Sequence, residues 1–140
     1  MLATPQSYIS FDFGMKNIGI AVGQIITGSA TALPALKAKD GIPHWPDILL
    51  LIEQWNACAL IVGIPLNMDG STQDMTFCAR KFARRLHNHS GLPVYEVDER
   101  LTTVEAKQLF HTQTKKAKIA IDSFAAKLIL ESWFNQQQSA

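Results

Sequence analysis

The sequence lacks the features that mark secreted and membrane proteins. It has only two cysteines, Cys58 and Cys78, and both lie in apolar surroundings, so neither a disulfide framework nor a zinc site is expected. No apolar run reaches the roughly 18 residues that a membrane-spanning helix requires. The first residues, MLATPQS, have no basic segment followed by an apolar one, as a secretory signal would. These absences predict a cytoplasmic protein that does not bind a membrane.

A net charge of one sign is also missing, because 13 Lys and Arg residues offset 12 Asp and Glu residues and leave +1. The distribution is less even than the total, since residues 80–89 contain four basic side chains and no acid. Such a patch can bind phosphate groups even on a nearly neutral protein, although a solvated helix face has the same composition. The four basic residues are Arg80, Lys81, Arg84 and Arg85.

The remaining composition is that of a globular domain. Of the 140 residues, 47% are hydrophobic and 18% are charged, which excludes a disordered chain. No repeat, low-complexity stretch or linker interrupts the sequence, so residues 1–140 are expected to form a single domain.

The apolar periodicity predicts three strands in the first third of the chain, at residues 7–13, 17–22 and 29–38. Strands and helices then alternate. The later elements are a helix at 46–56, a buried strand at 59–63, a helix at 72–88 with Ser71 as its N-cap, a strand at 93–98, a short helix at 102–111 and a last helix at 120–134. This order predicts an α/β fold of the ribonuclease H-like type. Its mixed five-stranded sheet has three antiparallel strands, then two parallel ones, and is flanked by helices.

Asp12 interrupts the apolar run ISFDFGMKNIGIAVG, where a carboxylate needs a binding partner. Gly14 and Gly19 around it have the spacing of a phosphate-binding loop, but the Lys and Ser or Thr that such a loop requires are absent. A dinucleotide-binding fingerprint fails too, because no helix follows. The actin-like ATPases share the three-strand start and an early D-x-G, but they need a second lobe that 140 residues do not supply.

Carboxylates recur at two other positions where they could converge with Asp12. Asp98 and Glu99 follow the strand at 93–98, and Asp122 lies in the first turn of the last helix. Phosphodiester chemistry with two metal ions requires carboxylates from separate elements, and Mg²⁺ prefers such oxygen ligands. A simpler interpretation stays open for two of these positions: Asp98 or Glu99 could cap a loop, and Asp122 could complement the helix dipole.

Four segments of the chain are familiar in combination: DFGMKNIGIA (12–21), VGIPLNMDGS (62–71), VDERLTT (97–103) and KIAIDSFAA (118–126). Through them, nearly the whole sequence resembles the YqgF/RuvX family of Holliday-junction-resolvase-like proteins. The resemblance implies an active site of Asp12, Glu99 and Asp122, with Asp98 as a secondary ligand. It also implies Mg²⁺ or Mn²⁺ as cofactor, with Asp12 bridging two ions.

Several other residues are candidates for contact with the substrate. Lys16 and Arg100 are adjacent to the acids and are candidates for holding the scissile phosphate, although a solvated lysine and an ion pair of Arg100 with an acid are equally simple explanations. The turn at Asn67 is expected to border the substrate. Arg80, Lys81, Arg84 and Arg85 would follow the nucleic acid backbone electrostatically.

The function implied by the resemblance is a nuclease, a hydrolase that processes the 5′ end of the 16S rRNA precursor during ribosome biogenesis. Its partners would be precursor rRNA and a pre-ribosomal particle, and the protein would act as a monomer or a weak homodimer. Two alternatives remain. A Holliday junction resolvase would act on branched DNA as a dimer, and a non-catalytic module would bind RNA or a protein partner without cutting.

Overall fold

The computed structural model describes residues 6–101 and 118–138, with the side chains of 6–100 and 123–137. This part of the chain contains one sheet of six strands in the order β4-β3-β2-β1-β5-β6. The expected mixed sheet is therefore confirmed, with one strand more than the five predicted. The strands are β1 (Ser7–Asp12), β2 (Asn17–Gln24), β3 (Ser29–Lys39), β4 (Ile42–Pro43), β5 (Ala57–Ile64) and β6 (Val94–Asp98).

Strand directions follow from the connections. β1, β2 and β3 pair in antiparallel fashion, whereas β5 runs parallel to β1, and β6 runs parallel to β5. The carboxyl ends of β1, β5 and β6 therefore meet at one edge of the sheet. We refer to it as the carboxyl edge.

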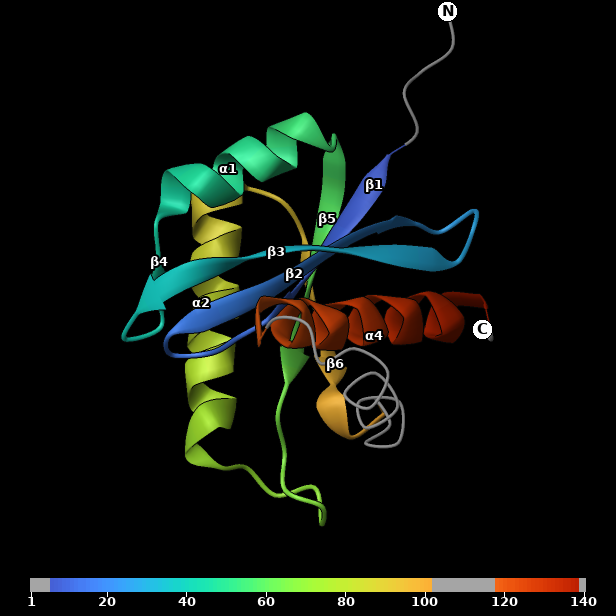
Figure 1. Cartoon of the computed structure of the whole chain (residues 1–140). Coiled ribbons are helices and arrows are strands. Elements are labelled where there is room, and N and C mark those ends of the chain that lie inside the picture. Colours follow the sequence, from blue (N-terminus) through green and yellow to red (C-terminus); the bar gives the residue numbers. More distant parts are fainter. Residues whose placement is uncertain (1–5, 102–117, 139–140) are drawn as a thin grey trace, which may run out of the picture.

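Helices cover both faces of the sheet (Figure 1). α1 (Trp45–Gln54) and α2 (Asp74–Ser90) pack on one face, where the core includes Phe11, Leu60 and Phe82. α4 (Lys118–Gln138) packs on the other, over Ala21 and Ile61. No helix among the described residues is long and apolar enough to cross a membrane.

The extra strand, β4, results from a tight turn. Asp40 and Gly41 both have positive φ, 53° and 78°, and they connect β3 to β4 as a two-residue hairpin loop. The Asp-Gly dipeptide is a typical signal of such a turn, because both central residues must adopt positive φ. The sequence analysis missed this signal because β4 is only two residues long.

The start of α2 differs from the prediction. Gln73, not Ser71, is the N-cap, and the helix begins at Asp74. The backbone N–H of Gln73 donates to Oγ1 of Thr76 at 3.0 Å, and the Gln73 side chain accepts from the backbone N–H of Thr76, which completes a reciprocal capping box. Ser71 instead belongs to the preceding loop. The predicted helix at 102–111 lies outside the described residues.

Candidate active site

Asp12 is the last residue of β1, at the carboxyl edge. Side chains alternate between the two faces of a strand. Ser10 donates a 2.6 Å hydrogen bond to the carbonyl oxygen of Ala126 in α4, so Asp12, two residues further on, belongs to the face that α4 covers. The Asp12 side chain is half-buried there.

Glu99 lies close to the same point. Phe11 of β1 pairs with Val62 of β5, so Asp12 and Gly63 are the next residues along the two neighbouring strands. A Cβ atom placed on Gly63 would lie 2.8 Å from Oε1 of Glu99 and would also contact Ile129 of α4. The Glu99 side chain therefore lies across β5 at Gly63, on the α4 face and beside the end of β1.

Gly63 is the site residue that the sequence analysis missed. A glycine within a strand often marks a place where another group approaches the backbone closely. Here two groups occupy the space that a side chain at position 63 would fill: Cδ1 of Ile129, which is nearest, and the side chain of Glu99 with its carboxylate. The signal was a single glycine at the end of the otherwise apolar run ALIVG.

The beginning of α4 is bound to the same region. The backbone N–H of Ile20 donates to Oγ of Ser123 at 3.3 Å, and Ser123 is 1% exposed. Ile20 pairs with Phe11, and the preceding Gly19 pairs with Asp12. Asp122, the residue before Ser123 in α4, is thus in a helix segment held next to the end of β1. Its side chain lies outside the described ones.

An irregularity in the sheet accompanies this contact. The register between β2 and β3 shifts after Ile18, where Ile18 pairs with Leu36 but Ile20 pairs with Leu33. The extra residue on β3 falls at Pro34 and Ala35, and proline has no N–H to contribute to a ladder. β3 pairs with β4 only at Ala38 and Lys39, so Pro34 also lies in a part of β3 that is at the edge of the described sheet.

Asp98 and Arg100 form an ion pair. Nη2 of Arg100 lies 2.6 Å from Oδ2 of Asp98, and Nε donates to both carboxylate oxygens at 3.1 and 3.0 Å. The Arg100 backbone N–H donates to Oδ1 as well. These hydrogen bonds from Arg100 lower the pKa of Asp98. The sequence left open whether Arg100 holds a phosphate or forms an ion pair with an acid, and the structure shows the ion pair.

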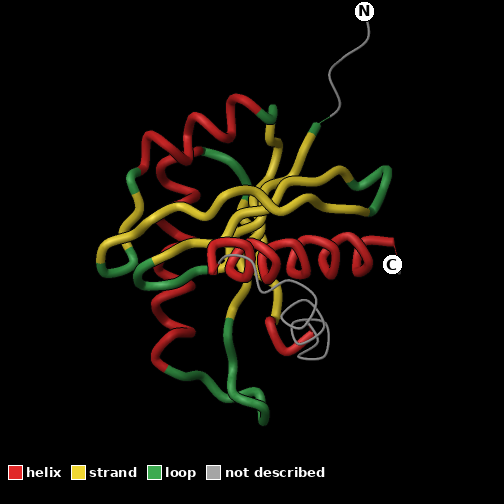
Figure 2. The backbone as a smooth tube through the Cα atoms, in the orientation of Figure 1, coloured by secondary structure: helices red, strands yellow, loops and turns green. Residues whose placement is uncertain are grey.

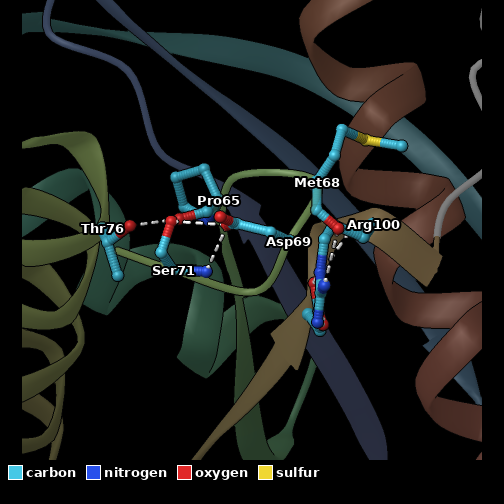
Figure 3. Close-up of polar contacts among 7 residues, drawn as sticks. Pro65, Met68, Asp69, Ser71, Thr76 and Arg100 are labelled. Atoms are coloured by element: carbon cyan, nitrogen blue, oxygen red, sulfur yellow. Dashed lines mark hydrogen bonds and ion pairs between the residues drawn. The ribbon is translucent and has the colours of Figure 1, made fainter. Parts of the chain in front are cut away.

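Arg100 also contacts the loop between β5 and α2, which extends beyond the sheet (Figure 2). Nη1 of Arg100 donates to the carbonyl oxygen of Met68 at 3.2 Å (Figure 3). Within the loop, Nδ2 of Asn67 donates to Oγ of Ser71 at 3.0 Å, and Ser71 donates to Oδ1 of Asp69 through its N–H and its hydroxyl. The Asn67 side chain thus braces the loop, and Arg100 ties the loop to β6.

The basic residues of α2 lie on the other side of the sheet from α4, because α2 packs against the opposite core. They fall into two rows. Arg80 lies 3.7 Å from Glu96 of β6, and Arg84 lines a cavity beside that strand, whereas Lys81 and Arg85 line a different cavity near the β1–β2 turn. The predicted single stripe of four is therefore divided. Lys16 is exposed on the β1–β2 turn itself.

Within residues 6–100 and 123–137, no three His, Cys, Asp or Glu side chains converge. Two of the three carboxylates expected from the sequence, Asp12 and Glu99, flank Gly63, and the third belongs to Asp122.

A family model described as "RuvX: Holliday junction resolvase" matches residues 6–136. The chain belongs to this family. A relative from Coxiella burnetii (strain Dugway 5J108-111) is 57% identical over 133 residues, 94% of each chain, and one from Pasteurella multocida is 54% identical over 93% of this chain and 95% of its own. Both carry the name "Putative pre-16S rRNA nuclease".

Solved structures with the same fold are also known. Thermus thermophilus RuvC in complex with a Holliday junction substrate has a TM-score of 0.62 at 13% identity, covering 96% of this chain and 97% of that one. The fowlpox virus Holliday junction resolvase has a TM-score of 0.57 at 12% identity, covering 94% and 99%. At these identities the likeness concerns the fold, which confirms the ribonuclease H-like prediction.

Proposed function

We propose that this protein is a metal-dependent nuclease that cleaves phosphodiester bonds at the 5′ end of the 16S rRNA precursor. The observation that carries the proposal is the placement of Glu99 over Gly63, beside the end of β1 where Asp12 lies. Asp12 and Glu99 come from separate elements and lie on one face of the sheet, and carboxylate oxygens are the ligands that divalent cations such as Mg²⁺ take. The family and the names of the relatives supply the substrate.

The residues fit Mg²⁺ or Mn²⁺, since all the donors are carboxylate oxygens. Asp12, Glu99 and Asp122 would hold the ions. When bound, such ions lower the pKa of a water molecule and stabilise the departing oxygen. Lys16, exposed on the turn that follows Asp12, would bind the phosphate being cut. We assign Asp98 and Arg100 to holding the loop at Asn67 rather than to the ions.

The test is cleavage of RNA carrying the 16S 5′ leader, with Mg²⁺ or Mn²⁺, by the wild type and by Asp12→Asn. We expect the substitution to reduce the rate by at least about 100-fold, the scale of losing one charge-stabilising group. Glu53→Gln is the matched control, because Glu53 is exposed on α1, which packs on the opposite face of the sheet. Binding of the leader without metal-dependent cutting would leave a non-catalytic RNA-binding module.

A second candidate is junction resolution, favoured by the description of the matching family model. Symmetric cutting of two strands requires a two-fold dimer. A four-way DNA junction in the same assay, with sedimentation of the protein at assay concentration, separates the two functions. If a dimer cuts the DNA junction and leaves the RNA leader uncut, the function is junction resolution and not rRNA processing.

A further inference from the structure

We infer that a pocket on the α2 side of the β1–β2 turn binds a phosphodiester that flanks the cleaved one in the RNA strand. Lys81 and Arg85 are its phosphate ligands. This inference rests on the proposed nuclease function and names a second contact region for the same substrate. The pocket has a volume of about 240 Å³ and lies between α2, the β1–β2 turn and the β3–β4 turn.

The pocket is next to the candidate active site along the chain. Phe13 follows Asp12 directly, and Phe13 and Met15 form one wall of the pocket. Because successive side chains of a strand point to opposite faces, Asp12 belongs to the α4 side and Phe13 to the α2 side, where its ring lies 5.3 Å from that of Phe82. An RNA strand that leaves the carboxylates and crosses the β1–β2 turn at Lys16 would therefore reach this pocket.

The charges in the pocket suit a phosphodiester. Lys81 and Arg85 are one helical turn apart on α2 and both line the pocket, which makes them neighbours on the helix surface. Asp40 is the only acid among the described lining residues, so the pocket carries a net charge of +1. A phosphodiester has a single negative charge, which this pocket would neutralise.

The walls of the pocket suit the rest of a nucleotide. Phe13 is half-buried, and Met15 is 41% exposed. Proteins that bind single strands combine cations for the backbone with aromatic or apolar surface for bases and sugars. Both kinds of surface are present within this one cavity. The cavity beside Arg84 also contains one acid, Glu96, but its described lining includes neither Phe nor Met.

The two rows of α2 provide a matched comparison. In an Asp12→Asn background, we expect Lys81→Ala/Arg85→Ala to weaken binding of a labelled single-stranded RNA with the 16S 5′ leader by about 10-fold. The slope of log K against log salt should fall by about 0.7 for each phosphate that the variant no longer binds. The proposal assigns the backbone contact expected of all four basic residues to Lys81 and Arg85 alone, since Arg80 is paired with Glu96. Arg80→Ala/Arg84→Ala removes the same charge from the same helix and should therefore change affinity less than about 2-fold. Equal losses of RNA affinity in the two double variants would overturn the proposal, because they would show that binding responds to net charge only.

Alkylation of the two cysteines gives a second measurement, made on the protein without substitutions in α2. Cys78 lines the pocket, whereas Cys58 is near the start of β5, away from the carboxyl edge, and both are half-buried. RNA should slow the alkylation of Cys78 by iodoacetamide and leave that of Cys58 unchanged. Unchanged alkylation of Cys78 at saturating RNA would overturn the proposal.

These outcomes are distinguishable from those of the proposed function. If the wild type cuts the leader but neither the double variant nor the footprint behaves as expected, the nuclease stands and the pocket does not. If nothing is cut but Cys78 is protected and Lys81→Ala/Arg85→Ala binds RNA more weakly, the pocket stands as a binding site for RNA without cleavage.

Discussion

The Glu99 carboxylate lies across the backbone of Gly63, in space that the smallest side chain would fill. A Cβ atom at Gly63 would be 2.8 Å from Oε1 and 3.0 Å from Cγ of Glu99. Cβ atoms essentially never approach other atoms more closely than 3.0 Å. Any substitution at this position must therefore displace Glu99 or α4, and the first prediction separates these effects.

Gly63→Ala is expected to reduce cleavage by at least about 100-fold, because a displacement of about 1 Å in a catalytic group has that effect. It should also lower the free energy of unfolding by about 1–3 kcal/mol through overpacking against Ile129. Adding Ile129→Val removes the Cδ1 atom that the new methyl group meets and should restore part of the stability without restoring cleavage. Recovery of both together would show that Gly63 serves packing alone.

The hydrogen bond from Ile20 to Ser123 makes a prediction about stability. Ser123→Ala leaves the buried N–H of Ile20 without its acceptor, which should cost about 1–3 kcal/mol in urea unfolding. Hydrogen exchange at the Ile20 amide should become faster. Ser29→Ala, at an exposed serine of β3, is the control and should stay within about 0.5 kcal/mol of the wild type. Equal effects of the two substitutions would contradict the role of Ser123.

The fold was predictable because its signals are periodic. The patterns extend over several residues, as in the alternation around Ile9 and Phe11 and the apolar run at Ala59–Gly63. One residue that departs from such a pattern does not change the predicted strand. Features that depend on one residue were predicted less well. The α2 cap at Gln73 is an example, because serine is the commoner N-cap and Ser71 stood two residues away.

The candidate site shows the same limit. Position along the chain indicated Asp12, the pair Asp98 and Glu99, and Asp122, and the family resemblance selected Glu99. Neither could reveal that Gly63 makes room for Glu99. That relationship depends on the register of β1 against β5. Because Arg100 is adjacent to the acids in the sequence, it had two possible roles, binding a phosphate or forming an ion pair with an acid. The choice between them depends on the guanidinium orientation, which the sequence does not encode locally.

The ion pair of Asp98 and Arg100 predicts a pH dependence. The folded pKa of Asp98 is lowered, so its contribution to stability is present above its unfolded value of about 4 and is lost as the pH falls through the folded pKa. In melting curves below about pH 4, Asp98→Asn should therefore show a shallower acid limb than the wild type. Arg100→Ala removes the cause of the shift and should flatten the limb similarly. An unchanged limb in both variants would contradict this account.

The hairpin turn at Asp40 and Gly41 makes the last prediction. Gly41→Ala puts a Cβ atom at φ 78° and 2.7 Å from Cζ of Phe13, which should cost about 1–3 kcal/mol in urea unfolding. Asp40→Asn is the matched substitution, because asparagine also tolerates positive φ, and it should cost less than about 0.5 kcal/mol. A Gly41→Ala protein as stable as the wild type would show that the turn relaxes freely.

The hydrogen bond between Ser10 and Ala126 joins residues 116 positions apart in the sequence. β1 is made early during synthesis and α4 late, so this contact and the one between Ile20 and Ser123 form only when α4 has left the ribosome. Segments separated by more than a hundred residues must therefore both be present before the face of β1 that carries Asp12 is covered.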